Sequence, residues 1–453
     1  MFAALALFAA ACSSDGDDGA EPAGGGGGTS GEGSGSEGTT DMSGADFSLF
    51  GAPTGVEGEA MQGFLSVYND ETGANIVYEG SDSFEEQLRI RVDGGNSPSV
   101  AFTPQPASIC DFANAGQLAS LEDMGFDIPT MEENHGKFWM DLGVCADGNH
   151  YGIPWFPNYK SIVWYRTSLF EDRGYEIPET YDDLVALSQQ MVADGVTPWC
   201  FGFGSEAASG WPATDWVEDI VVRSAGTDVY TQWFRHEIPF NDPQIADAVN
   251  RFGEIFFGDG FVLGGTENVA AIDFREAPLP LFNEEGGCAM HKQGSFIANF
   301  FPPGEEDEVS FFDFPSIDGN NAAMGGGDTL MVFDATPEAV QAVKDWITPD
   351  WECVLASPSG GSASELGGHG VEGVERLPGH KDVPLDCYES ETARNQAEAV
   401  RDAIADNTFV FDASDLMPPA VGQGTFWTAM LDWSRGAQTD QVLTSVESSW
   451  PQP

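Results

Sequence analysis

Apolar residues follow two alternating patterns in the first part of the chain. In the segment GEAMQGFLSVYND (58–70) they recur at the spacing of one helix face. The runs 75–81 and 99–105 predict strands, and each precedes a helix-like segment, 84–95 or 109–124. Strands that alternate with helices predict an α/β fold with a mostly parallel sheet. In such a sheet, ligands bind at the carboxyl ends of the strands.

This rhythm changes near the middle of the chain. Two strand-like runs, YGIPWF (151–156) and SIVWY (161–165), are separated by the turn-like segment 157–160. We place the crossing from one lobe into a second lobe at this turn. A helix follows, with Thr180 as its predicted N-cap and Asp183 three residues later.

Strand, loop, strand and helix recur over 309–319 and 325–347, which we interpret as a return to the first lobe. A chain of 453 residues exceeds one ordinary core and suits two lobes of roughly 150–200 residues. The predicted organisation is a first lobe over 46–160, a second lobe over 161–305, a return to the first lobe over 306–350, and a helical segment over 351–453 that completes the lobes and the hinge.

Acidic residues dominate the charge of the chain. Its 17 Lys and Arg residues face 74 Asp and Glu residues, which gives a formal net charge of −57. Such a surface repels nucleic acid and anionic lipid head groups, so neither is an expected partner. The 12 Trp and 32 Phe residues exceed what packing alone requires and favour a ring-lined binding cleft.

The N-terminus has the features of an export signal. Residues 1–11 form an apolar run too short to span a bilayer, and small residues precede Cys12, as in a lipobox. We therefore interpret 1–12 as a lipoprotein signal peptide that ends at the lipid-modified Cys12. The Gly-, Ser- and acid-rich segment 13–45 predicts a disordered tether. This places the protein outside the cytoplasm, anchored to the cell membrane by lipid alone.

Six further cysteines fit an oxidising compartment. None lies in a CxxC motif or beside a His at metal-ligand spacing, so we expect structural disulfides and no metal site. Six cysteines allow fifteen pairings, and we take the sequential one as a working hypothesis. It pairs Cys110 with Cys145, Cys200 with Cys288, and Cys353 with Cys387.

Four segments carry a family resemblance. Residues 151–191, YGIPWFPNYKSIVWYRTSLFEDRGYEIPETYDDLVALSQQM, resemble the centre of the extracellular solute-binding proteins of ABC transporters, in the large carbohydrate-binding family 1. Residues 198–223, 281–297 and 415–431 look like the branch that includes α-glucoside-binding proteins. The similarity covers nearly everything from Asp46 onward. Residues 362–381 depart from it and look like an insertion.

The resemblance implies a two-lobed, periplasmic-binding-protein-like fold of type II, with hinge-connected lobes that close over a sugar. It further implies a monomer that does no chemistry, needs no cofactor, and delivers its carbohydrate to the membrane permease of an ABC importer. Other subunits would hydrolyse ATP, and the chain accordingly carries no phosphate-loop motif.

Sugars present apolar ring faces and a rim of hydroxyls, so their sites combine aromatic rings with planar hydrogen-bonding groups. In the second lobe, Trp211 and Asp215 lie where a helix would start facing the cleft, and Phe296 follows Gly294 and Ser295. We expect Trp211 and Phe296 to stack on the ligand and Asp215 to bind its hydroxyls. The alternative for each ring is an ordinary place in the core.

Further candidates lie at the crossing and at strand ends. Trp155, Asn158 and Tyr159 belong to the crossing. Glu57 and Gln105 follow strand ends, and Asp328 follows three glycines that would let the backbone approach a ligand. The alternative for such polar residues is that they only cap or turn the chain.

Two other classes of function are compatible with secretion. A glycosidase would need paired carboxylates, and Asp215, Glu218 and Asp219 share a helix face. In so acidic a chain such triplets arise by chance. A surface adhesin, or a binding protein for a non-sugar solute such as a peptide or an anion, is the other alternative, and the negative charge disfavours the anion.

Overall fold

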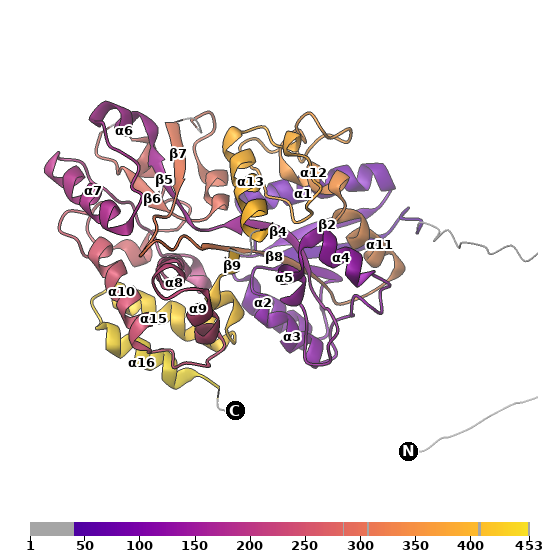
Figure 1. Ribbon diagram of the computed structural model, residues 1–453. Coiled ribbons are helices and arrows are strands. Elements are labelled where there is room, and N and C mark those ends of the chain that lie inside the picture. Colours follow the sequence, from indigo (N-terminus) through magenta and orange to yellow (C-terminus); the bar gives the residue numbers. More distant parts are fainter. Residues whose placement is uncertain (1–39, 284, 306–307, 406–408, 452–453) are drawn as a thin grey trace, which may run out of the picture. The chain divides into compact units, whose positions relative to one another are not determined.

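Nine strands form two separate sheets in the computed structural model, which describes residues 40–283, 285–305, 308–405 and 409–451 (Figure 1). Cys12 and residues 13–39 of the predicted tether lie outside these residues. The tether was predicted to reach residue 45, but Met42 is 5% exposed and packs in the same core as Ala45. The folded body therefore begins before residue 46.

The first sheet has the strand order β2-β1-β3-β8-β4, and β9 pairs with β8. Its strands are β1 (Asp46–Gly51), β2 (Asn75–Gly80), β3 (Val100–Thr103), β4 (Ile153–Tyr159), β8 (Ala323–Val332) and β9 (Phe409–Phe411). The pairs of β1 with β2 and β3 are parallel, whereas β8 runs antiparallel to β3 and β4. The predicted mostly parallel sheet is thus a mixed one, because β8 enters it from the opposite lobe.

The second sheet is short and antiparallel. It consists of β6 (Met290–Lys292), β5 (Ile162–Arg166) and β7 (Val309–Asp313), in that order. Helices supply most of this lobe's core, in which rings such as Trp199, Trp216 and Phe252 are buried. A three-stranded sheet offers too little area for one face of a core, so helix packing provides the rest.

Helices of the first lobe are α1 (Gly55–Thr72), α2 (Phe84–Asp93), α3 (Ala107–Asn114), α4 (Ile128–His135), α5 (Lys137–Asp141), α11 (Pro337–Trp346), α12 (Pro349–Ala356) and α13 (Glu391–Ala405). Those of the second lobe are α6 (Thr167–Arg173), α7 (Tyr181–Ala193), α8 (Trp211–Ala225), α9 (Thr227–Phe234), α10 (Pro243–Phe256), α14 (Ala413–Leu416), α15 (Trp427–Ser434) and α16 (Thr439–Ser449). Thr180 caps α7 in a capping box with Asp183, as predicted. None of the described helices has the length and apolar character needed to cross a bilayer.

The chain passes between the two lobes three times. The first passage, at Lys160 and Ser161, joins β4 to β5, and the second lies between β7 and β8. Since β7 still belongs to the second sheet, the return expected at residue 306 falls after Asp313. The third passage, at Asp412, joins β9 to α14. The last helices, α15 and α16, then pack on α8 and α10 of the second lobe (Figure 1).

Backbone hydrogen bonds hold these three passages together. The amides of Lys160 and Ser161 both donate to the carbonyl of Met324, at 3.0 and 3.2 Å. The amide of Met324 donates to Ser161 Oγ at 2.7 Å, and the amide of Asp412 donates to the carbonyl of Gly325 at 2.8 Å. All three connections therefore meet at the start of β8.

A buried ion cluster joins the passages to α8. Lys160 Nζ lies 3.1 Å from Asp215 Oδ1 and 2.5 Å from Asp412 Oδ2. Burial disfavours the charged ammonium, but Asp215 and Asp412 raise the pKa of Lys160 well above its ordinary value. Lys160 therefore remains a cation inside the protein and links β4, α8 and the start of α14.

A second set of buried charges lies one turn further along α8. Asp219 pairs with Lys292 of β6 at 3.1 Å and with Arg223 on its own helix. Asp219 also accepts a hydrogen bond of 2.8 Å from Ser161 Oγ. Both groups of buried charges on α8 therefore contact the first passage between the lobes.

Three disulfides pair the six cysteines in the order suggested by the sequence: Cys110 with Cys145, Cys200 with Cys288, and Cys353 with Cys387. Their Cα–Cα distances are 5.3, 5.7 and 5.3 Å, within the range that a disulfide spans. The longest of the three loops, between Cys200 and Cys288, holds α8 and α10 within the second lobe.

We expect Lys160→Met to destabilise the protein by about 3–5 kcal/mol, because Asp215 and Asp412 would stay buried without their cation. Urea unfolding near neutral pH measures this change. The matched control is Lys137→Met. Lys137 also bridges two acids, Glu132 and Asp141, but its side chain is 65% exposed, so a change of at most about 1 kcal/mol is expected. Equal losses in both variants would contradict the structural role of the Lys160 cluster.

Candidate ligand-binding site

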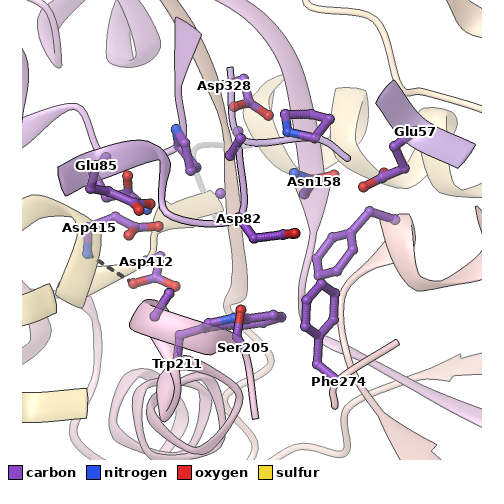
Figure 2. A pocket seen from close by; sticks show the side chains of 18 of the residues that line it. Glu57, Asp82, Glu85, Asn158, Ser205, Trp211, Phe274, Asp328, Asp412 and Asp415 are labelled. Atoms are coloured by element: carbon purple, nitrogen blue, oxygen red, sulfur yellow. Dashed lines mark hydrogen bonds between the residues drawn. The ribbon is translucent and has the colours of Figure 1, made fainter. Parts of the chain in front are cut away.

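A cavity of about 180 Å³ lies between the strand ends of the first sheet and the N-terminus of α8 (Figure 2). We call it the inner chamber. Six of the nine residues that the sequence suggested for ligand binding line it: Glu57, Gln105, Asn158, Trp211, Phe296 and Asp328. They come from both lobes, so the chamber belongs to the cleft between them.

Three aromatic rings of the second lobe form one wall of the inner chamber. The ring centroid of Trp211 lies 5.1 Å from that of Phe274 and 5.7 Å from that of Phe296. Trp211 and Phe296 remain partly exposed towards the cavity. Edge and tilted ring contacts of this kind fix the rings relative to one another.

Glycine places Trp211 at the chamber. Gly210, the N-cap of α8, has a φ of 113°, which a residue with a side chain rarely adopts. A Cβ atom at this position would lie 2.3 Å from the carbonyl oxygen of Trp427. The absent side chain thus lets the start of α8 pack against Trp427, another residue that lines the chamber.

Strand ends of the first sheet supply the opposite wall. Glu57 lies in the first turn of α1, Asp82 and Glu85 flank the start of α2, and Gln105 follows β3. Burial raises the pKa of the Glu85 carboxyl. These residues accept hydrogen bonds readily, and several converge on one small volume (Figure 2).

The floor is formed by β8 and the third passage. Gly326, Gly327 and Asp328 of β8 line the chamber in succession. Burial raises the pKa of Asp328 to about 7, against the opposing effect of Arg376. Burial also raises the pKa of Asp415 well above its ordinary value, so this part of the site includes carboxyl groups that hold protons unusually tightly.

Three predicted ligand-binding residues do not line the inner chamber. Trp155 is fully buried in the first-lobe core, against Phe64 and Trp346. The Tyr159 hydroxyl donates to Asp313 Oδ1 at 2.7 Å. Asp215 lies one helical turn beyond Trp211 and does not line the cavity, whereas Lys160 does. The Lys160 ammonium forms an ion pair with Asp215 Oδ1. A strand alternates its faces, which explains why Asn158 reaches the site and its neighbour does not.

One ion pair and one hydrogen bond connect the lobes across the chamber. Arg275 Nη2 lies 2.6 Å from Asp82 Oδ1 and 3.4 Å from Thr54 Oγ1. Elsewhere, Asn299 Nδ2 donates to Glu57 Oε1 at 3.0 Å. Arg275 and Asn299 belong to the second lobe, whereas their partners follow strands of the first lobe. The structure is therefore a closed form of the cleft.

Comparison with known proteins identifies the family to which this architecture belongs. Residues 52–348, well over half of the chain, match the family model described as bacterial extracellular solute-binding protein. The chain belongs to this family. Its fold is the two-lobed type II fold of that family's sugar-binding structures.

Two curated relatives of this solute-binding protein cover most of both chains. The osmoprotective compounds-binding protein GgtB of Synechocystis is 37% identical over 406 residues, 89% of this chain and 92% of its own. The α-glucosides-binding periplasmic protein AglE of Rhizobium meliloti is 35% identical over 421 residues, 90% and 88% of the two chains. Among solved structures, the solute receptor AcbH matches with a TM-score of 0.73 at 17% identity, over 89% of this chain and 98% of its own.

Several residues that line the chamber of this solute-binding protein were not among those predicted from the sequence. Asp82 and Glu85 follow a strand end, so the rule that found Glu57 would have found them. Arg275 and Phe274 lie in a loop without regular pattern, and no local signal marks them. Arg376 comes from residues 362–381, the stretch that departs from the family resemblance.

Two groups of residues in the described chain have the composition of metal sites. The carboxylates of Asp215, Glu218 and Asp412 offer oxygens within 4.8 Å of one another, but the Lys160 ammonium already contacts two of them. The other group consists of Glu132, Asp141 and His150 near the surface, where Lys137 bridges the two acids. In both groups a lysine supplies the positive charge that a metal ion would bring.

Asp328→Asn should flatten the pH dependence of stability. In the unfolded chain an aspartate loses its proton near pH 4, whereas folded Asp328 keeps its proton up to about pH 7. Folded protein therefore binds more protons in this window, and this residue's contribution to stability falls as pH rises. We expect the variant to gain on the order of 1–4 kcal/mol relative to wild type between about pH 5 and pH 8.

Urea unfolding of the ligand-free protein at several pH values measures this effect. Asp70→Asn, at an exposed aspartate of α1, controls for the loss of one carboxyl group. Parallel stability curves for wild type and Asp328→Asn would contradict the assignment of this slope to Asp328.

Proposed function

We propose that this protein is the substrate-binding lipoprotein of a bacterial ABC importer and captures a carbohydrate, an α-glucoside or another short oligosaccharide, in the inner chamber. The observation that carries the proposal is the pairing of an aromatic wall with converging carboxyl, amide and guanidinium groups. The rings suit the apolar face of a sugar, and the polar groups suit its hydroxyls. The name of the Rhizobium relative gives α-glucosides and that of the Synechocystis relative gives osmoprotective compounds.

The charges of the chamber support an uncharged ligand. Each of the three cations that line it faces a carboxylate: Lys160 faces Asp412, Arg275 faces Asp82, and Arg376 faces Glu57. An anionic solute would have to displace one of these carboxylates and approach a protein of net charge −57. A polyol is uncharged and displaces no carboxylate, because its hydroxyls donate hydrogen bonds to carboxylates and accept them from Arg and Lys.

The glycosidase alternative depended on Asp215, Glu218 and Asp219, and each of these acids has a partner within the protein. Glu218 accepts hydrogen bonds from the amides of Ala413 and Ser414, which begin α14. Asp219 pairs with Lys292 and Arg223, and Asp215 pairs with Lys160. None of these three acids lines the inner chamber. Their arrangement favours a structural role in holding the passages between the lobes.

The remaining parts of the proposal rest on the sequence. Cys12 would carry the lipid, residues 13–39 would form most of the tether, and a permease in the cell membrane would receive the sugar from a monomer of this protein. The site would be extracytoplasmic. Members of the family are solute-binding proteins, and we propose accordingly that this one binds without turnover and needs no cofactor.

Calorimetric titration with glucose, trehalose, sucrose, maltose and maltotriose tests the proposed function. We expect saturable binding of at least one glucoside, with no products on chromatography after long incubation. A ligand at 100 times its dissociation constant should also raise the free energy of unfolding by roughly 2.7 kcal/mol. No binding of any carbohydrate would refute the proposal, and product formation that is lost in a variant which still binds sugar would refute binding without turnover.

Trp211→Ala should weaken sugar binding by about 1–3 kcal/mol, because a partly exposed ring that contacts the ligand is removed. Trp155→Ala should instead destabilise the protein by about 3–5 kcal/mol, since Trp155 is a core residue. Calorimetry with the tightest sugar and melting temperatures of both variants separate the two effects. If Trp211→Ala binds as tightly as wild type, the aromatic wall is not the ligand platform.

A further inference from the structure

A second, larger cavity of about 810 Å³ adjoins the inner chamber. We call it the outer chamber. Asn158, Phe296 and Arg376 line both cavities, so these three side chains separate one from the other. Arg376 is the charged residue of this partition, and it comes from residues 362–381, which the similarity to α-glucoside-binding proteins left unexplained.

Packing holds Arg376 in place. The residue is 7% exposed, its guanidinium carbon lies 4.7 Å from the ring centroid of Phe156, and Nη2 lies 3.5 Å from Glu57 Oε1. Glu57 in turn accepts a hydrogen bond from Asn299, whose Oδ1 accepts one of 3.0 Å from the amide of Glu375. The segment that contains Glu375 and Arg376 therefore contacts both lobes at the partition.

The same guanidinium has unused donors. Arg376 Nε and Nη2 are buried and have no hydrogen-bond partner among the residues that the structure describes. A buried N–H group without a partner costs free energy, and it costs more on a charged group. Hydroxyl oxygens of a bound solute in the inner chamber would satisfy these donors.

The outer chamber also has features of a sugar site. Phe301 and Phe311 supply rings, and Gln396, which is 3% exposed, has a side-chain Nε2 without a hydrogen-bond partner among the described residues. An oligosaccharide that passed the partition would find rings and an amide there. Arg376 lies between the two chambers.

We propose that Arg376 sets the length of the ligand. It donates to the outermost hydroxyls of a short glycoside in the inner chamber and closes that chamber against the outer one. The inference rests on the proposed function. The ligand would then be a glycoside of the size of a mono- or disaccharide, and Arg376 would be the residue that excludes longer oligosaccharides.

Calorimetric titration with maltose, maltotriose and maltotetraose, together with trehalose, tests the inference. Wild type should bind one of the two disaccharides at least tenfold more tightly than maltotetraose. Arg376→Met keeps the packed stem and removes the donors, so it should weaken disaccharide binding by about tenfold or more. Arg376→Ala also opens the partition, so the affinity ratio of maltotetraose to disaccharide should rise at least tenfold over wild type.

Arg401→Ala is the matched control, because Arg401 donates to the carbonyl of Val383 in the same lobe and lines neither chamber. It should leave the affinities and their ratio unchanged. Melting temperatures identify any variant that fails to fold, and the wild-type length preference tests the inference without a variant. Equal wild-type affinities for disaccharide and maltotetraose, or the same ratio in Arg376→Ala as in wild type, would overturn the inference alone. Absence of binding to every sugar would overturn the proposed function as well.

Discussion

The ammonium of Lys160, held between Asp215 and Asp412, connects the parts of the molecule on which everything else depends. Lys160 begins the first passage between the lobes, Asp412 forms the third, and Asp215 belongs to α8, whose first residue is Trp211. A buried cation with two carboxylates tolerates little displacement, because separation would leave charge without compensation in a poorly solvated interior. The cluster therefore fixes both the crossing of the backbone and the starting point of the aromatic wall.

The same cluster bears on the chemistry of the ligand site. Lys160 Nζ lies 5.5 Å from the ring of Trp211 and lines the inner chamber, so the structural cation is also part of the floor. Asp412 is ionised despite its burial, because Lys160 and several hydrogen bonds lower its pKa. Burial raises the pKa of Asp328 and of Asp415, so these carboxyl groups hold their protons more tightly. One small site thus presents both charged acceptors and carboxyl groups that are able to donate, and a polyhydroxylated solute uses both.

Sequence patterns predicted much of this arrangement. The alternation of strands and helices and the rule that ligands bind at strand ends pointed to Glu57 and Gln105, the crossing expected at 157–160 pointed to Asn158, and the preceding glycines pointed to Asp328. All four line the inner chamber. The antiparallel direction of β8 was not predicted. The direction of a strand depends on the lobe from which the chain enters the sheet, and the local sequence pattern carries no information about that. Asp215 was assigned to the ligand because its partner, Lys160, is distant in the sequence. Pairings of buried charges are set by tertiary contact, so a single sequence cannot show them.

The three passages also have a consequence for how the protein is made. The second lobe contains residues from β5 to β7 and then α14 to α16, so its core is completed only by the last helices of the chain. During synthesis, the N-terminal part of a chain appears first. Here the surfaces of α8 and α10 that receive α15 and α16 stay uncovered until residues 427–449 have been translated. Neither lobe is a contiguous gene segment, and an exchange of the second lobe between relatives must carry two separate stretches of sequence at once.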